Sequence, residues 1–305
     1  MRWLMLCREP RLYSCKRIKN ACIKRGIELD ILDPNKMLLM LNNGKFEVFY
    51  QQEREHYAKS YSEAVLLKDY DGILPRFGTS STEMGCTVLR HFEAKGIPVL
   101  NNAQAFALAR NKWQSLQRLV EYGLPVPKTN LAGDLVSVKS QLNHFSFPLI
   151  AKVLNGSQGN GVMLFENRHN AESVLSTFRQ VEEAYLCQEF VTESKGRDIR
   201  VFVIGDKVVA AMSRTSAAGD FRANLHQGGI AESIELTEEE KILAIKATQV
   251  IGLEVAGVDF FRTTNGAVVL EVNASPGFEG IEQINEIDIA LEIVDYFIRK
   301  ISKLS

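Results

Sequence analysis

The sequence predicts a mixed fold, α/β in its first third and α+β in the rest. A strand, a helix and a second strand follow one another in residues 2–32, and this β-α-β order favours a parallel sheet covered by helices. Later apolar runs separated by short Gly-containing turns indicate antiparallel hairpins, the clearest in residues 255–277. At 305 residues the chain exceeds one typical core, so two or three subdomains are expected. We place three segments at 1–101, 102–190 and 191–305.

Composition argues against several classes of protein. The chain is 46% apolar and 24% charged, with a net charge of −1, so no global field attracts nucleic acid and any phosphate binding must be local. No apolar run approaches a membrane span, and charges flank the first apolar residues too closely for a signal peptide. The five cysteines are odd in number and lack C-x-x-C spacing. They fit reduced thiols in the cytoplasm better than disulfides or zinc.

Residues 1–101 are predicted to form a small open α/β domain. Gly26 follows the first helix at the position where a left-handed residue commonly ends a helix. No G-x-G-x-x-G occurs here, which argues against dinucleotide binding. The polar stretch 51–69 receives no assignment. The expected elements are strands at 2–7, Ile27–Leu32, 45–50, Asp71–Leu74 and Ile97–Leu100, and helices at Tyr13–Arg25 and from Ser80 to Lys95.

Residues 102–190 centre on a strand that contains Lys152 and on the loop 155–161, which has three glycines. A lysine in a strand is either an edge residue whose ammonium reaches water or a charge directed at a phosphate. The loop is either a mobile connection or a set of backbone amides that bind phosphate oxygens. It is not a Walker A loop, because a strand follows it and no Gly-Lys-Ser/Thr is present. The expected elements are helices at Ala103–Ala109, Trp113–Tyr122 and Asn170–Gln180, and strands at Phe147–Val153, Val162–Phe165 and Tyr185–Val191.

Two connections in the third segment have functional and plain interpretations. The strand that ends at Val191 leads into a polar linker, and such a hinge either presents backbone groups to an adenine beside Phe190 or is a simple strand end. The loop 214–229 has few apolar anchors, and loops of this length are functional or disordered. Its Arg and Asn side chains suit phosphate or carboxylate. The expected elements are strands at Asp198–Ile204 and Lys207–Arg214, a helix capped by Thr237 that runs to Ile251, the hairpin of 255–277, and a terminal helix from Ile281 or Ile287 to about Ser302.

The hairpin of 255–277 carries three polar residues in apolar strands: Asp259, Glu271 and Asn273. Glu271 and Asn273 are two apart and share a face. A three-residue loop ending at Gly266 pairs Asp259 with Glu271, whereas a two-residue turn places Asp259 on the other face. Facing carboxylates repel unless a cation lies between them, so we expect removal of either one to abolish turnover with little unfolding. Oxygen ligands without His or Cys favour Mg²⁺ or Mn²⁺ beneath a triphosphate. The plain interpretation is strand ends that face water.

Taken in order, these features resemble the ATP-grasp superfamily of carboxylate–amine ligases. Within it the chain is similar to the RimK family of glutamate ligases, and the similarity covers nearly the whole chain. The segments that carry it are Leu-Tyr-Ser-Cys-Lys-Arg (12–17), Leu-Asp-Pro (32–34), Gly-Ser-Gln-Gly-Asn-Gly-Val (156–162), Gly-Arg-Asp-Ile-Arg (196–200), Gly-Asp-Phe-Arg-Ala-Asn-Leu-His (219–226), Val-Ala-Gly-Val-Asp (255–259) and Leu-Glu-Val-Asn-Ala-Ser-Pro-Gly (270–277).

The resemblance implies an ATP-grasp architecture in which an open N-terminal α/β domain precedes two α+β subdomains that clasp ATP. It implies that L-glutamate is joined through an acyl-phosphate to the C-terminal carboxylate of a protein, a small-subunit ribosomal protein, and that the enzyme is a homo-oligomer such as a tetramer. It further implies roles for individual residues. These are Lys112, Lys152, Gly156, Ser157, Gly159, Gly161, Glu189, Phe190, Asp198, Arg222, Ala223 and Asn224 for ATP, Arg222 and Asn224 for catalysis, and Asp259, Glu271 and Asn273 for two Mg²⁺ or Mn²⁺ ions.

One departure from the family pattern concerns the acceptor. The family has an Arg where this chain has Gln227, and loss of that cation weakens the grip on an acidic acceptor or on glutamate. Two alternatives therefore stay open. The same chemistry can serve another acceptor, such as an amino-group carrier protein, a deazaflavin coenzyme or a peptide, or the chain can bind ATP without catalysis.

Overall fold

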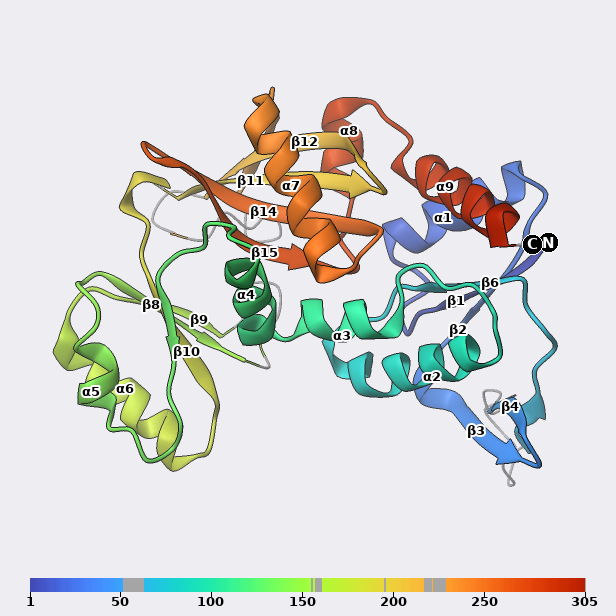
Figure 1. Cartoon of the computed structure of the whole chain (residues 1–305), viewed down its shortest axis with the longest axis horizontal. Coiled ribbons are helices and arrows are strands. Elements are labelled where there is room, and N and C mark those ends of the chain that lie inside the picture. The colour runs from blue at the N-terminus through green and yellow to red at the C-terminus, as the bar shows by residue number, and fades with distance from the viewer. Residues whose placement is uncertain are drawn as a thin grey trace.

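A computed structural model describes residues 1–51, 63–154, 156, 161–194, 196–216, 221 and 229–304 of the chain. It has three parts, which Figure 1 shows as an N-terminal domain on the right, a small lid at lower left and a larger sheet above. Within the described residues, no helix has the length and apolar character needed to cross a bilayer.

The N-terminal domain is built on a parallel sheet of order β2-β1-β6, which confirms the predicted β-α-β unit. Gly26 has φ +66° after the first helix, as its position predicted. The predicted strand Ile97–Leu100 is wrong, because this segment makes an isolated bridge from Val99 to Ile73 and no ladder. The elements are β1 (Arg2–Leu6), α1 (Tyr13–Lys24), β2 (Glu28–Leu32), β6 (Gly72–Pro75) and α2 (Thr82–Ala94), with 3₁₀ turns at Pro34–Lys36 and Thr79–Ser81.

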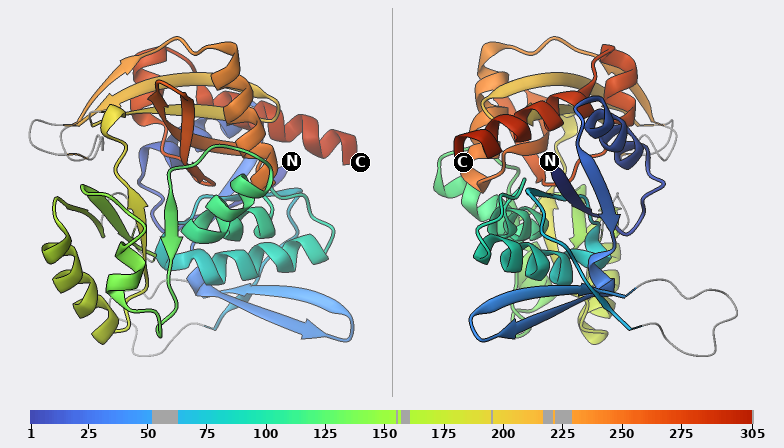
Figure 2. Two further views of the ribbon diagram at one scale, coloured as in Figure 1. Left: turned by 60° about the vertical axis from the view of Figure 1, so that its left-hand side comes forward. Right: turned by 90° about the vertical axis from the view of Figure 1, so that its right-hand side faces the viewer.

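A second, antiparallel sheet projects from this domain, as the light-blue hairpin in Figure 2 shows. It consists of β3 (Met37–Asn42), β4 (Lys45–Tyr50) and β5 (Val65–Leu66). The strand at 45–50 was predicted, and its partner β3 was missed. Asn43 and Gly44, which connect β3 to β4, both have positive φ, the backbone conformation that a tight hairpin turn requires.

Two helices, α3 (Ala103–Arg110) and α4 (Lys112–Glu121), connect the N-terminal domain to the rest. Phe106 of α3 packs on Phe77, with ring centroids 4.4 Å apart. Helix α4 contacts a helix and a strand of the C-terminal part. Each helix is N-capped by an asparagine, Asn102 and Asn111, whose side chain accepts a backbone N–H three residues on. The boundaries at 101 and 190 stay predictions.

The lid, residues 129–189, is a four-stranded antiparallel sheet of order β7-β10-β8-β9 with two helices over it. It has a small core of its own, in which Leu142, Leu149 and Leu175 are fully buried. The predicted strand of Lys152 and the strand after the glycine loop are confirmed, while β7 and α5 were missed. The elements are β7 (Thr129–Leu131), α5 (Val138–Leu142), β8 (Leu149–Val153), β9 (Val162–Phe165), α6 (Arg168–Gln180) and β10 (Tyr185–Glu189).

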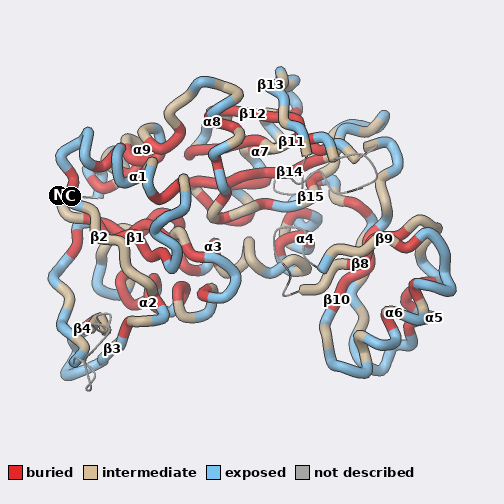
Figure 3. The backbone as a smooth tube through the Cα atoms, turned by 180° about the vertical axis from the view of Figure 1, so that it is seen from behind, coloured by how far each residue is buried: buried red, intermediate tan, exposed pale blue. Residues whose placement is uncertain are grey.

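The C-terminal sheet has five antiparallel strands in the order β13-β12-β11-β14-β15. Figure 3 shows buried stretches along β11, β14 and α9. The predicted cap is confirmed, since Thr237 and Glu240 form a capping box at the start of α7. The terminal helix, expected to start at Ile281 or Ile287, is α9 and starts at Ile289, whereas Ile281 lies in the separate helix α8. The elements are β11 (Arg197–Ile204), β12 (Lys207–Thr215), β13 (Ile230–Ser233), α7 (Glu238–Ile251), β14 (Val255–Thr263), β15 (Gly266–Asn273), α8 (Glu279–Asn285) and α9 (Ile289–Leu304), after a 3₁₀ turn at Thr192–Ser194.

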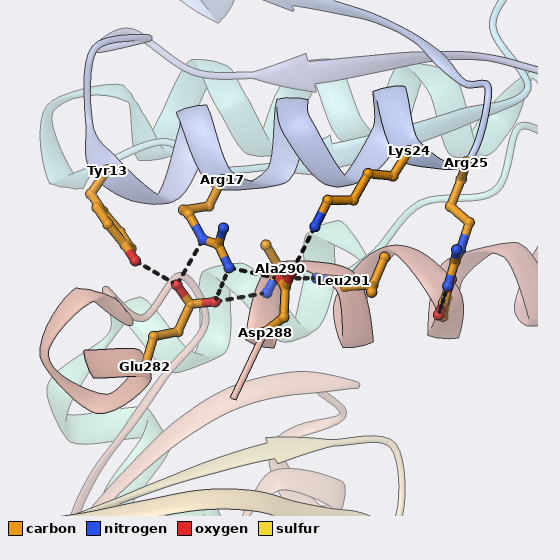
Figure 4. A network of polar contacts seen from close by, with 9 residues as sticks. Tyr13, Arg17, Lys24, Arg25, Glu282, Asp288, Ala290 and Leu291 are labelled. Atoms are coloured by element: carbon orange, nitrogen blue, oxygen red, sulfur yellow. Dashed lines mark hydrogen bonds and ion pairs between the residues drawn. The ribbon is translucent and has the colours of Figure 1, made fainter. Parts of the chain in front are cut away.

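The last helices return to the N-terminal domain and bind it through charged groups (Figure 4). The buried carboxylate of Glu282 accepts hydrogen bonds from Tyr13 Oη at 2.8 Å and from Arg17 Nε at 3.0 Å. Nearby, Arg25 makes a paired contact with Asp295 at 2.6 and 2.7 Å.

A second tie is the side chain of Asn101, which is 2% exposed. Its amide donates to the carbonyls of Val255 and Ala274, and its oxygen accepts the N–H groups of Glu254 and Val255. The N-terminal domain and the C-terminal sheet therefore form one body, to which the lid is joined at 123–128 and 190–196.

Candidate active site

A cavity of about 170 Å³ lies between the lid sheet and the C-terminal sheet, at the hinge that joins them. Ligand pockets are commonly ~300–1,000 Å³, so the cavity enclosed by the described residues is smaller than a typical ligand pocket. Polar and charged side chains from both sheets meet here. The lining residues are Ile150, Lys152, Val162, Gln188 and Glu189 of the lid, Phe190, Val191, Ser194 and Gly196 of the hinge, and Asp198, Arg200, Arg214, Phe221, Asp259, Phe261, Leu270 and Glu271 of the C-terminal part.

The β14–β15 hairpin places Asp259 opposite Glu271, which confirms the predicted pairing. The predicted reason is wrong. Thr263 pairs with Gly266, which by itself would offset the two carboxylates by one residue. The ladder then shifts register between Asp259 and Phe260, as at a β-bulge, and the shift restores the pairing. Both carboxylates line the cavity as a result.

Two arginines lie between the carboxylates of this site. Arg200 of β11 donates from Nε and Nη2 to the two oxygens of Asp259, at 2.7 and 2.6 Å. Its Nη2 also lies 4.0 Å from Glu271 Oε1. The expected repulsion between Asp259 and Glu271 is therefore wrong for this state of the protein, because a guanidinium already supplies the cation.

Arg214 of β12 extends the network in the other direction. It donates to both oxygens of Asp198 at 2.7 Å and to Asp259 Oδ2 at 2.9 Å. Burial raises the pKa of Asp259, but its pairs with Arg200 and Arg214 outweigh burial and lower that pKa to about 2. Burial dominates at Asp198 and raises its pKa to about 6 against the pull of Arg214. Asp259 is thus the carboxylate that the network keeps ionised.

The side chains at this edge fit a divalent metal ion. Glu271 is 47% exposed, and Asn273 donates from Nδ2 to Glu271 Oε1 at 2.9 Å, so an accessible carboxylate and an amide lie together. Asp259 accepts three bonds from arginines, which leaves one of about four lone-pair positions for a metal. Oxygen donors in this number suit Mg²⁺, which keeps water and substrate phosphates in its other positions. The described residues contain no group of three or more His, Cys, Asp or Glu side chains that could by itself hold a metal ion.

The sequence matches a family model described as the RimK PreATP-grasp domain over residues 1–106 and one described as the RimK-like ATP-grasp domain over residues 109–297. The chain belongs to the RimK family. RimK-family relatives named "Probable alpha-L-glutamate ligase" include one from Haemophilus influenzae, 54% identical over 298 residues and 97% of each chain. Another, from Pasteurella multocida, is 51% identical over 306 residues, 100% of this chain and 96% of the relative.

Solved structures confirm the ATP-grasp fold. The fold is similar to that of a RimK domain protein from Sphaerobacter thermophilus (TM-score 0.73, 20% identity, 97% of this chain and 99% of that one). It is also similar to the D-alanine–D-alanine ligase of Bacillus anthracis solved with ATP (TM-score 0.70, 17% identity, 100% and 98%). A third structure is the ligase PsnB with a precursor, Mg and ADP (TM-score 0.72, 21% identity, 98% of each chain). ATP and a divalent metal ion belong to this family's chemistry.

The RimK-like part places Lys152 in the cavity wall, on β8. Burial lowers its pKa to about 8, and Glu271 opposes that shift. Lys112, at the start of α4, donates from Nζ to the carbonyls of Leu154 and Gly156, at 2.7 and 2.5 Å. Lys152 is therefore the lysine directed into the cavity, whereas Lys112 holds the beginning of the glycine loop.

The described ends of that loop are Gly156 and Gly161. Gly161 has φ +76°, and a Cβ there would lie 3.0 Å from Val153 Cβ, so the position requires glycine. At the hinge, Glu189 Oε1 accepts the N–H of Lys128 at 2.7 Å, and both Glu189 and Phe190 line the cavity. Other predicted site residues lie outside the described residues: Ser157, Gly159, Arg222, Ala223, Asn224 and Gln227.

Sequence reasoning missed the part that Arg200 and Arg214 play at Asp259. The available signal was the two-residue spacing of Asp198 and Arg200, which puts both on one face of their strand. The missing step was that β11 pairs directly with β14, with Arg200 opposite Asp259. That pairing joins strands about sixty residues apart in the chain, and no local sequence pattern predicts it.

Proposed function

We propose that this RimK-family chain is an ATP-dependent ligase that joins L-glutamate to the C-terminal carboxylate of a small-subunit ribosomal protein. The observation that carries the proposal is identity of 51–54% with named glutamate ligases along 97–100% of the chain. The cavity supports it, since a lysine and acidic side chains from two sheets converge at a hinge, as a site for a nucleotide with metal ions requires.

The chemistry has two steps. An oxygen of the acceptor carboxylate attacks the γ-phosphorus of ATP, so that a C(O)O–P bond forms and ADP leaves. The glutamate amine then attacks the acyl carbon, a C–N bond forms, and inorganic phosphate leaves with the amine's proton passing to solvent or a base. No covalent intermediate on a protein side chain is needed, so positioning and charge neutralisation are the protein's contributions.

Individual residues would contribute to this positioning and charge neutralisation. Lys152 would bind ATP phosphates, with Lys112 holding the base of the glycine loop against them. The hinge at Glu189 and Phe190 would contact the adenine, and Asp198 the ribose. Arg222 and Asn224 would act at the transferred phosphoryl group, with the backbone of Ala223 beside them. Ser157, Gly159 and the loop's other glycines would cover the phosphates.

The metal ions in this proposal are two Mg²⁺ or Mn²⁺ held by Asp259, Glu271 and Asn273. When bound, such ions neutralise the charge that develops on the phosphates. Arg200 would then have to share Asp259 with an ion, since it holds both carboxylate oxygens at 2.6–2.7 Å.

We place the reaction in the cytoplasm, where the ribosome is assembled and where the five free thiols would stay reduced. The enzyme would act as a homo-oligomer, a tetramer by resemblance. Because this chain has Gln227 where the family has an Arg, the identity of the acceptor is the part of the proposal to test first.

The test is to incubate the purified enzyme with ATP, Mg²⁺, L-glutamate and purified ribosomal protein S6, and to measure the intact mass of the acceptor and the release of ADP. We expect mass increments of whole glutamyl residues, with ADP release that depends on both glutamate and acceptor. Glu271→Gln is the matched control and should give neither.

Parallel incubations with a carrier protein, a deazaflavin coenzyme and an acidic peptide distinguish the acceptors. Glutamylation of one of these in place of S6 would overturn the assignment of the ribosomal acceptor. A phosphorylated acceptor that is stable without amine would identify a kinase, and no ADP release with any acceptor would identify a module that binds ATP without catalysis.

A further inference from the structure

Two half-buried arginines, Arg76 and Arg110, lack the carboxylate partner that several other arginines of the chain have. The Nε atoms of Arg76 and Arg110 are buried and have no hydrogen-bond acceptor among the described residues. By contrast, Arg200, Arg214 and Arg262 each bind a carboxylate through two nitrogens. Shielding a guanidinium from water without a carboxylate partner costs free energy, so the absence of a partner requires an explanation.

The contacts that Arg76 and Arg110 do make hold them in place without neutralising them. Arg76 Nη2 donates to Ser14 Oγ at 2.8 Å and to the carbonyl of Pro276 at 3.0 Å. Arg110 Nη2 donates to the carbonyl of Phe77 at 2.9 Å. All three acceptors are neutral oxygens, and each guanidinium also lies over an aromatic ring, Arg76 over Phe278 and Arg110 over Phe106. Each is therefore oriented without a carboxylate partner among the described residues.

The two groups are close to one another and to the edge of the cavity. Arg110 donates to the carbonyl of Phe77, the residue next to Arg76. Burial lowers the pKa of Arg110, and the nearby positive charge of Arg76 lowers it further. Glu271 acts on Arg110 in the opposite sense. Arg76 binds Pro276, three residues beyond Asn273. The pair thus borders the acidic end of β15, at the junction of the N-terminal domain and the C-terminal sheet.

A thiol does not replace the missing anion. Cys15 lies near Arg76 and 3.3 Å from Cys7, sulfur to sulfur. The hydrogen bond from Cys7 lowers the pKa of Cys15 to about 7, with Arg76 contributing. Arg76 nevertheless directs its described hydrogen bonds to Ser14 and Pro276, and sulfur is a weak acceptor.

We propose that Arg76 and Arg110 bind a carboxylate group of one of the two substrates, beside the Glu271 edge of the cavity. Guanidinium forks match a carboxylate bidentately, and two of them on different elements select a planar anion at a defined place. The inference rests on the proposed function, in which both free glutamate and the acceptor chain end carry carboxylates. Neither arginine lines the cavity at the hinge, so the site is distinct from the place assigned to adenine and ribose.

Kinetics of substituted enzymes distinguish the two sources. Arg76→Lys and Arg110→Lys keep the charge and lose the fork, and Arg110→Met loses both. The matched control is Arg118→Met on α4, whose arginine is partly exposed and pairs with Glu121 at 3.3 Å. The KM values for ATP, glutamate and S6 are measured separately for each purified protein.

We expect the KM of one carboxylate substrate to rise roughly 10- to 100-fold, the size that losing charge-assisted hydrogen bonds predicts, while the KM for ATP stays within about twofold and Arg118→Met behaves as the wild type. A rise for glutamate assigns the site to the amino acid, and a rise for S6 assigns it to the chain end. Glutamate and S6 KM values that both stay within twofold in the Arg76 and Arg110 variants overturn the proposal.

A binding measurement keeps the site testable apart from turnover. With Mg²⁺–ADP present, glutarate should raise the Tm of the wild type and of Arg118→Met, whereas the uncharged glutaramide should not, and Arg110→Met should lose the response. If no acceptor is glutamylated but this pattern holds, the proposed function fails and the carboxylate site stands. Equal shifts with glutarate and glutaramide, or a response that survives in Arg110→Met, overturn the site.

Stability without ligand separates a binding arginine from a structural one. The Arg110 guanidinium has a buried Nε with no acceptor among the described residues. Removing this charge in ligand-free Arg110→Met should therefore leave the Tm equal to or above that of the wild type. A lower Tm would show that Arg110 serves the fold and would overturn its assignment to substrate binding.

Discussion

Asp259→Asn should damage both stability and activity, whereas Glu271→Gln should damage activity alone. Asp259 is 2% exposed at its side chain, and its two oxygens accept three bonds of 2.6–2.9 Å from Arg200 and Arg214. An asparagine of the same size places an NH₂ group against a guanidinium N–H, so that two donors meet. It leaves Arg214 with Asp198 alone and Arg200 with only the more distant Glu271, 4.0 Å away.

The magnitude follows from that burial. Removing one member of a buried ion pair costs about 3–5 kcal/mol. With unfolding entropy of about 2.1 cal/mol/K per residue, such a loss lowers the Tm of a 305-residue chain by roughly 5–8 °C. Glu271 is 47% exposed and lies 4.0 Å from Arg200, so Glu271→Gln should change stability by less than about 1 kcal/mol.

The assay is urea unfolding followed by far-ultraviolet circular dichroism at pH 7, beside ADP release in the complete reaction mixture. We expect a lower urea midpoint for Asp259→Asn with the slope unchanged, an unchanged midpoint for Glu271→Gln, and loss of turnover in both. Equal midpoints for Asp259→Asn and the wild type would refute the reasoning, because the arginines would then not depend on this carboxylate.

Three further predictions follow from single positions. Lys152 must be protonated to bind phosphate, and burial lowers its pKa to about 8, so kcat/KM for ATP should fall about tenfold per pH unit above that value. Lys152→Arg should move this fall to higher pH, and an unshifted profile would contradict the assignment. Asn101→Ala removes the hydrogen-bond partner of four backbone groups at the junction and should lower the free energy of unfolding by about 3 kcal/mol or more. Loss of the neighbouring N-cap in Asn102→Ala should lower it by about 1 kcal/mol. Equal losses would contradict the role of Asn101 in joining the N-terminal domain to the C-terminal sheet. Gly161→Ala forces a side chain into φ +76° and a 3.0 Å contact, and should cost about 1–2 kcal/mol, while Gly133→Ala, which meets open space, should be neutral in the same thermal melt.

Local chemistry made much of the fold predictable. The β-α-β unit, the hairpin of β14 and β15 and the capping box at Thr237 each depend on residues close together in the chain, and each was predicted. The strand predicted at Ile97–Leu100 was wrong, because an apolar run after a helix looks like a strand whether or not a neighbour is available to pair with it. The short β7 and the α5 helix, three and five residues long, are below the length at which periodicity is visible.

The site was predictable as a set of residues and not as a geometry. Spacing put Glu271 and Asn273 on one face, but the register shift that brings Asp259 opposite Glu271 depends on how β14 sits between two strands. The pairing of Arg200 with Asp259 depends on the same sheet. Such relations are tertiary, and the sequence of either strand alone does not contain them.

The charged contacts of Glu282 with Tyr13 and Arg17 have a consequence for the order of events during repeated catalysis. They attach the N-terminal domain to the C-terminal sheet, so Arg76 and the carbonyl of Pro276, 3.0 Å apart, lie on one body. Under the proposed function, a chain end bound at Arg76 and Arg110 would stay on this body while nucleotide is exchanged between it and the lid. Such a division would allow successive additions to one acceptor molecule without its release between turnovers.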